Sequence, residues 1–250
     1  MGPKASQIKY FDGSIYEGSV NAEGKEDGQG KITYVNGDNL KGTFEDGDCT
    51  YAIIHKKKTG DTYEGNMKDF KYHGRGKLTT QKYKQVGLFR DNRFVHGKIN
   101  FADGSSYEGA IENGHKTGKG IFVTKDGTRL EGYFRNDKLE GNAEVRSRDG
   151  TIYNGQFRNG IYHGRGHLQQ IEGGSTALDY EGEFFEGEFH GYGRLKLDSG
   201  DDYQGTFEMG KKHGRGKYVF GNGDVYEGNY VDDKREDENC RISLHTGAHY

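Results

Sequence analysis

Polar and apolar residues alternate along short stretches of the chain, and the alternation recurs at a nearly constant spacing. The stretch from Asp202 to Gly228 shows it most clearly. Tyr203, Gly205 and Phe207 occupy alternate positions, and a second alternating run follows after a polar turn. A period of two residues is typical of a β-strand. Each stretch of this kind therefore predicts one β-hairpin.

The glycine that follows Tyr-x recurs ten times along the chain. Its positions are Gly18, Gly42, Gly65, Gly87, Gly109, Gly132, Gly155, Gly182, Gly205 and Gly228. Most steps are close to 23 residues, a period that indicates a repeat architecture. We predict an all-β fold, an elongated single-layer antiparallel sheet of about nine or ten stacked hairpins. The array would span residues 7–230, after a flexible leader at 1–6 and before a charged C-terminal cap or tail at 231–250.

The spacing within one copy also predicts how its strands pair. Gly205 and Gly214 are nine residues apart, so a turn at the midpoint would place them opposite each other. A three-residue loop with Gly223 in the left-handed region would then place Tyr226 opposite Tyr218. The same counts pair Glu64 with Arg75 and Glu108 with Lys119. This register sets glycines in a lane along one face of the sheet, with aromatic rings beside it.

Some copies depart from the pattern. Copy two has Tyr51 and Ile53 where glycines are expected, so we predict that they fill the lane there. Copy four is also weak, with Gln85 at the Tyr position. Copy seven contains an insertion at residues 171–178, predicted to project as a loop. Ile242 and Leu244 predict one last, degenerate strand.

Composition and charge narrow the function classes. The chain has 43 glycines, one proline, 30% hydrophobic residues and a net charge of -3, which provides no field to attract nucleic acid or an anionic membrane. Cys49 and Cys240 are eight copies apart, which favours free thiols and a reducing compartment. No apolar run has the length of a membrane span. Gly2 fits the loose N-myristoylation pattern, although Pro3 is an awkward neighbour.

Few residues are candidates for catalysis or for metal or phosphate binding. Histidines recur at one repeat position, but copies about 10 Å apart cannot share a metal ion, so we expect structural hydrogen bonds. These are His73, His96, His163, His190 and His213. The His-Gly-Arg-Gly-Lys runs superficially resemble phosphate loops, but their amides should be used in strand pairing. We predict no catalytic residue, no metal and no cofactor, and therefore no enzyme.

The repeated unit, an aromatic-Glu-Gly strand, a short turn and a His-Gly-x-Gly strand closing on Asp-Gly, resembles the MORN repeat. The match covers about residues 8–230. The Trp that the family usually has two residues after the first glycine is absent here, most often replaced by Phe. The resemblance implies a single-layer twisted sheet of stacked hairpins and a place in cytoskeletal assemblies, cilia and flagella included.

The glycine lane is the remaining candidate site. In one interpretation the neighbouring rings lean over the glycines and fill the lane. In the other, part of the aromatic surface stays open and accepts an apolar helix or strand of a partner. The predicted partner-binding residues are Tyr63, Tyr107, Phe134, Tyr153, Phe157, Tyr180, Phe184, Tyr203, Phe207 and Tyr226.

We therefore expect a non-enzymatic scaffold that docks or spaces partner proteins, in the cytoplasm and associated with the cytoskeleton or a ciliary or flagellar axoneme. A single sheet with two exposed faces also favours self-association into a homo-oligomer. The alternative is a phosphoinositide or membrane-surface module, using Lys56–Lys58 and strand-borne arginines and lysines, which the near-neutral charge disfavours. A lesser alternative is a targeting subunit for an enzyme on another chain.

Overall fold

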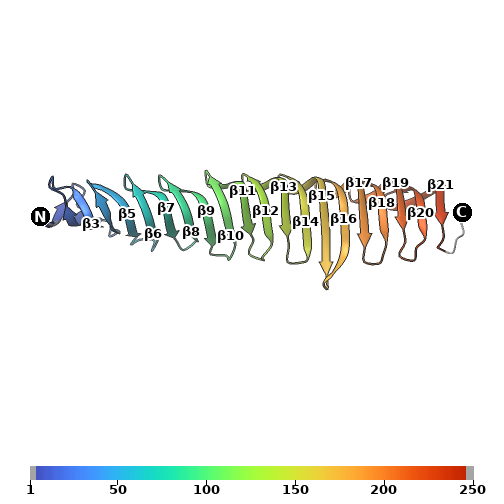
Figure 1. Cartoon of the computed structure of the whole chain (residues 1–250), viewed down its shortest axis with the longest axis horizontal. Helices are drawn as coiled ribbons and strands as arrows, with labels where there is room; N and C mark the ends of the chain where they lie inside the picture. Colours follow the sequence, from blue (N-terminus) through green and yellow to red (C-terminus); the bar gives the residue numbers. More distant parts are fainter. Residues whose placement is uncertain (1–3, 246–250) are drawn as a thin grey trace. The chain divides into compact units, whose positions relative to one another are not determined.

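The computed structural model describes residues 4–245, so Gly2 lies outside the described part. Every regular element in this part is a β-strand, and no helix here is long and apolar enough to cross a membrane. The chain divides into two compact units, residues 1–114 and 115–250. Figure 1 shows the strands following one another in chain order within each unit. The predicted all-β class and stacked antiparallel hairpins are confirmed.

Unit 1 is an open antiparallel meander in which each strand pairs with its neighbours in sequence. Its strands are β1 (Lys4–Lys9), β2 (Ile15–Val20), β3 (Glu26–Thr33), β4 (Asn39–Glu45), β5 (Asp48–His55), β6 (Thr62–Lys68), β7 (Lys71–Thr79), β8 (Tyr83–Arg90), β9 (Arg93–Phe101) and β10 (Ser106–Glu112). β1 begins inside the segment expected to be a flexible leader.

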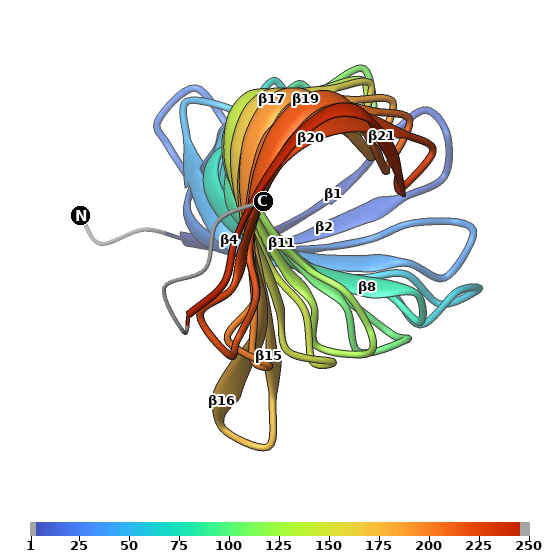
Figure 2. The ribbon, with the colours of Figure 1, turned by 90° about the vertical axis from the view of Figure 1, so that its right-hand side faces the viewer.

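Unit 2 has the same meander connectivity. Its strands are β11 (His115–Val123), β12 (Arg129–Arg135), β13 (Lys138–Arg146), β14 (Thr151–Arg158), β15 (Ile161–Glu172), β16 (Ser175–Phe185), β17 (Glu188–Leu197), β18 (Asp202–Glu208), β19 (Lys211–Val219), β20 (Val225–Val231) and β21 (Lys234–Ser243). In the end-on view of Figure 2, β17, β19 and β20 are seen to bend along their length. β21 contains Ile242 of the predicted last strand, opposite Tyr226, but ends at Ser243, before Leu244.

Two turn types connect most of the strands, and both follow from local sequence. Within a copy the turn has two residues with positive φ, such as Met209 (47°) and Gly210 (82°), which matches the right-handed twist of a hairpin. Between copies a three-residue loop ends in a left-handed glycine, such as Gly223 with φ 88°. The amide of Gly223 donates to the carbonyl of Phe220 at 2.8 Å. The predicted three-residue loop is confirmed.

The predicted register holds between copies and slips within them. Tyr226 lies opposite Tyr218 and Gly228 opposite Gly216, as expected. Within the copy, Phe207 pairs with Lys212 next to the turn, but Gly205 pairs with Gly216 and not with Gly214. The cause is a β-bulge of two residues around Gly214, whose φ of 76° favours glycine.

The same bulge corrects a predicted cross-strand pair in unit 1. Glu64 lies opposite Lys77 instead of Arg75. The bulge inserts an even number of residues, two. The alternation of side chains between the two faces is therefore the same before and after the bulge. The face that carries Gly205 and its equivalents is called the glycine face below, and the other the opposite face.

Copy two breaks this rule, and the prediction for it was wrong. Its bulge shifts the register by one residue, so that Thr43 pairs with Tyr51 but Phe44 with Cys49. A one-residue slip exchanges the faces. Ala52 therefore lies in the lane opposite Gly42, while Tyr51 and Ile53 are exposed on the opposite face.

The insertion in copy seven was also predicted imperfectly. It projects, but as a longer hairpin and not as a loop, because β15 and β16 continue their pairing to Glu172 and Ser175. Gly173 and Gly174, both with positive φ, form its turn. Figure 1 shows this hairpin extending beyond its neighbours.

The glycine lane has no room for side chains because tyrosine rings lie across it. A methyl group added to Gly216 would overlap Cε2 and the hydroxyl of Tyr203. Where leucine replaces the tyrosine, the lane contains alanine. Leu40 accompanies Ala52 in copy two, and Leu130 accompanies Ala143 in copy six.

This pairing of residues generates a test of the lane. Gly216→Ala should lower the free energy of unfolding by about 1 to 3 kcal/mol, since overpacking forces the ring of Tyr203 to move. In the double variant Tyr203→Leu/Gly216→Ala the two losses should not add, with a coupling of at least about 0.5 kcal/mol. Urea unfolding of the four proteins measures this. Strict additivity would contradict the proposed overlap.

Candidate functional site

The tyrosines of the glycine face share one hydrogen bond. In each regular copy the hydroxyl donates to the backbone carbonyl three residues later, at the point where the bulge interrupts strand pairing. These bonds are Tyr16 to Ser19 (2.6 Å), Tyr63 to Asn66 (2.7 Å), Tyr107 to Ala110 (3.0 Å), Tyr153 to Gln156 (2.9 Å), Tyr180 to Glu183 (2.8 Å), Tyr203 to Thr206 (3.0 Å) and Tyr226 to Asn229 (3.1 Å). The hydroxyl therefore provides a partner for a carbonyl that the ladder leaves free.

The rings two residues after the first glycine connect successive tyrosines. Phe184 contacts Tyr180 of its own copy and Tyr153 of the preceding copy, edge to face, with centroids 5.1 Å apart in both pairs. Phe207 and Tyr230 continue the contacts to Tyr226. Edge-to-face pairs contribute about 0.5–1.5 kcal/mol each beyond burial of area. In unit 2 they form one continuous row of rings.

A third group from the second strand of the hairpin covers several tyrosines. Tyr72 stacks on Tyr63 with centroids 3.7 Å apart, and Phe189 stacks on Tyr180 at 3.8 Å. In the last copies a cation takes this place, with the guanidinium of Arg235 5.2 Å from the ring centre of Tyr226. Tyr72 and Phe189 are half-buried and Arg235 is exposed, whereas the tyrosine rings beneath them are buried.

All ten predicted partner-binding residues lie on the glycine face and are at most 5% exposed. The interpretation in which rings fill the lane is confirmed. Direct contact of a partner with these ten residues stays a prediction, and any such contact would have to displace or include the covering groups.

Three of the five recurring histidines lack the predicted hydrogen bond at one ring nitrogen. Nδ1 of His73, His190 and His213 is buried without a hydrogen-bond partner in the described part of the chain. His73 lies 3.6 Å from a carboxylate oxygen of Asp91 and His213 3.5 Å from Glu208, which are ion-pair distances when the ring is protonated. Within residues 4–245, no group of three or more His, Cys, Asp or Glu side chains could hold a metal ion.

Carboxylates next to cations or turn amides are held in the ionised form. Burial alone would raise the pKa of Asp137, but hydrogen bonds from the Lys116 amide, His115 and the Lys116 ammonium outweigh it and lower the pKa to about 2. The hydrogen bond from Arg194 lowers the pKa of Asp202. Such groups act as structural ion pairs and not as proton donors near neutral pH.

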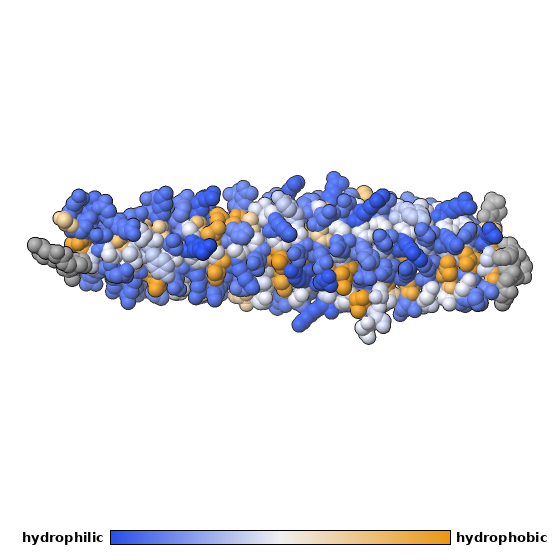
Figure 3. Space-filling view, viewed as in Figure 1, coloured by the Kyte–Doolittle hydropathy of each residue, from blue (hydrophilic) through white to orange (hydrophobic). Residues whose placement is uncertain are grey.

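The opposite face presents its side chains to solvent, and reasoning from the sequence missed its apolar part. Tyr51, Ile53, Val86 and Leu88 are each 40–45% exposed there. Val86 stands at the position that glutamate occupies in most copies, which is the signal that could have revealed it. On the side drawn in Figure 3, apolar patches are small and surrounded by polar residues.

Comparison with known families identifies the repeat. The MORN repeat model matches residues 16–39, 63–83, 107–129, 131–152, 153–175, 180–202 and 203–225. These segments make up more than half of the chain, which therefore belongs to the MORN-repeat family. The two longest gaps between matched segments, residues 40–62 and 84–106, correspond to copies two and four, and both of these copies have the one-residue slip.

Comparisons with curated protein sequences and with solved structures add no information about function. No curated protein sequence matches the chain. Among solved structures, the TCP10 domain of CPAP from Danio rerio is 14% identical, with 98% of this chain and 97% of that chain covered and a TM-score of 0.32. The SAS-4 (dCPAP) TCP domain of Drosophila melanogaster, in complex with a proline-rich motif of Ana2 (dSTIL), is 9% identical over 98% and 87%, with a TM-score of 0.20. At these TM-scores neither structure says anything about the function of this chain.

The recurring tyrosine hydrogen bond predicts the effect of removing one hydroxyl. Tyr180→Phe should lower the free energy of unfolding by about 1 to 2 kcal/mol, because the carbonyl of Glu183 loses its donor at a part-buried site beside the buried Tyr180 ring. Tyr192→Phe is the matched control, since Tyr192 is 55% exposed. Urea denaturation compares the two. Equal small losses would show that the hydroxyl bond contributes nothing.

Burial also predicts the response to alkaline pH. It raises the pKa values of Tyr63, Tyr153 and Tyr180 above the usual value, and that of Tyr203 to about 12, with a further contribution from Asp233. The folded state therefore binds these protons more tightly than the unfolded chain, whose tyrosines titrate near pH ~10.

Stability from these groups is fully present below pH ~10 and is lost as the pH rises from ~10 toward ~12. Thermal unfolding between pH ~8 and ~11.5 should show a falling Tm only above pH ~10. The tyrosinate absorbance should increase together with unfolding. Complete tyrosinate formation in a still-folded protein would contradict the buried hydrogen bonds.

Proposed function

We propose that the chain is a non-enzymatic scaffold that docks partner proteins on its sheet. The supporting observation is the contrast between its faces. The glycine face is filled by its own rings, whereas the opposite face keeps strand-borne side chains exposed on successive strands of each unit. Backbone hydrogen bonds fix the strands that carry this surface, so only side chains have to become ordered on binding.

We place this scaffold in the cytoplasm, within a cytoskeletal, ciliary or flagellar assembly. The support is membership of the MORN-repeat family, whose members we expect in such assemblies, together with the absence of a paired thiol at Cys49. Burial raises the pKa of the Cys49 thiol to about 12, which keeps it protonated and unreactive. Its role is packing against Gly42 in the lane.

Proximity labelling in ciliated cells tests the proposal. The full chain fused to a labelling enzyme should enrich proteins of the axoneme or cytoskeleton over the labelling enzyme alone, and at least one of them should form a complex of fixed stoichiometry with the purified chain. Enrichment of membrane proteins only, or of no protein, would refute the scaffold role.

A further inference from the structure

The opposite face of unit 1 carries two pairs of exposed apolar side chains. One pair is Tyr51 and Ile53 on β5, and the other is Val86 and Leu88 on β8. Ile53 and Val86 lie in the same cross-strand row, in which Glu64 on β6 and Lys77 on β7 stand between them. Three strand spacings separate the pairs by about 14 Å. Both pairs belong to the copies in which the bulge has slipped by one residue.

Cations surround these apolar pairs. In the two central rows of this face, the strands from β2 to β10 carry five cations and three carboxylates, Glu17, Glu64 and Glu108. The cations are Lys31, Lys41, Arg75, Lys77 and Lys98. None of the five forms an ion pair with another residue of the described part of unit 1. Lys41 lies directly opposite Lys31, a like-charge pair that is destabilising, while Glu17 lies opposite Lys31 on its other side.

On the same face of unit 2, several cations form ion pairs. Arg194 pairs with Asp202 at 2.5 Å, and Lys217 with Glu227 at 3.4 Å. Arg146 also pairs with Glu144, at 2.5 Å. Arg165 and Arg215 on this face form no ion pair within the described part of unit 2, so the difference between the units is one of degree: no cation in the two central rows of unit 1 is paired.

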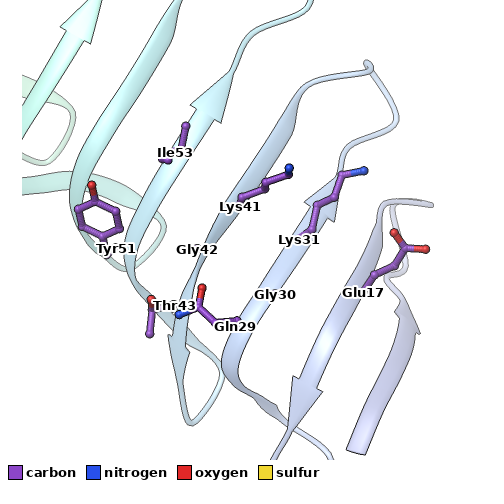
Figure 4. A pocket seen from close by; sticks show the side chains of 9 residues that line it. All are labelled: Glu17, Gln29, Gly30, Lys31, Lys41, Gly42, Thr43, Tyr51 and Ile53. Carbon is purple, nitrogen blue, oxygen red and sulfur yellow. Dashed lines mark hydrogen bonds between the residues drawn. The ribbon is translucent and has the colours of Figure 1, made fainter.

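The cations and apolar residues line two hollows. One, of about 390 Å³, is bordered by Glu17, Lys31, Lys41, Tyr51 and Ile53, and Figure 4 shows these side chains on one side of β2 to β5. The other, of about 490 Å³, extends from Tyr51 across β6 and β7 to Leu88 and His96. Tyr51 belongs to both hollows, so together they extend across the strands from β2 to β9.

We propose that this face of unit 1 binds an acidic segment of a partner protein whose apolar side chains contact the two pairs. The inference rests on the proposed scaffold function and names the surface and the partner chemistry. Carboxylates of the segment would neutralise the five cations, and two apolar side chains about 14 Å apart would cover the exposed pairs, a distance that about four extended residues span. The hollows suit a narrow segment better than a flat bilayer.

A random peptide library displayed on phage and selected against the full chain tests the chemistry. The selected peptides should be rich in Asp and Glu with spaced apolar residues, and their affinity should fall with added salt. Synthetic versions of the selected peptides are then titrated against variants. Peptides of other composition, or no enrichment over many rounds, would overturn the proposal.

Variants locate the binding surface. Lys41→Glu/Lys77→Glu and, separately, Ile53→Thr/Val86→Thr should each weaken the selected peptide by about tenfold or more. Arg215→Glu/Lys217→Glu, on the same face of unit 2, is the matched control and should change affinity by less than about twofold. Circular dichroism and the Tm show that each variant is folded. Equal loss in the control, or unchanged binding in both unit 1 variants, would overturn the assignment.

Two further measurements test whether a lipid membrane or a second copy of the chain binds this face of unit 1 instead. Vesicles of phosphatidylcholine with phosphatidylinositol bisphosphate should not sediment the chain at physiological salt. If they do, and the unit 1 variants lose this sedimentation, the ligand of the face is a lipid and not an acidic peptide. Analytical ultracentrifugation of the wild type and variants should show the same state, and dimers lost in the variants would assign the face to a second copy. If proximity labelling finds partners that the unit 1 variants retain, the scaffold function stands and only this surface assignment fails.

Discussion

The structure depends on the placement of a tyrosine ring over two glycines of adjacent strands, with its hydroxyl bonded to the carbonyl freed by the bulge. The ring needs the glycines because no methyl group fits beneath it, as at Gly205 and Gly216 below Tyr203. The bulge needs a left-handed glycine, such as Gly214, and leaves a carbonyl that the hydroxyl satisfies. A sheet with one main layer in each unit thereby buries rings without a second layer, by folding each side chain back along its own strands.

Much of this arrangement was predictable from residue spacing. The alternation of Tyr203, Gly205 and Phe207 gave the strands, and the Asn-Gly and Asp-Gly dipeptides gave the loops between copies. The slip at Gly214 was not predictable from alternation, because a two-residue bulge leaves the parity of both strands unchanged. In copy two the opposite problem arose. A one-residue bulge reversed parity, so Tyr51 and Ile53 were assigned to the wrong face.

The candidate site was predictable only in part, for a related reason. The ten aromatic residues do line the lane, but the sequence did not show that second-strand rings such as Tyr72 and Phe189 would cover them. These covering residues alternate less regularly because they lie between the turn and the bulge. On the opposite face, the sequence analysis considered only cross-strand ion pairs and cations that could contact lipid headgroups, so the exposed apolar residues were not recognised.

The one-residue slip of copies two and four has an evolutionary consequence. Deleting or adding a single position beside the turn reverses which side chains point inward for the remainder of that strand. Such a repeat can move apolar residues from interior to surface through a change in length, with little change in amino-acid usage. Selection acting on indels next to hairpin turns could therefore create new recognition surfaces on an otherwise uniform array, and those surfaces would escape profile searches tuned to the regular repeat.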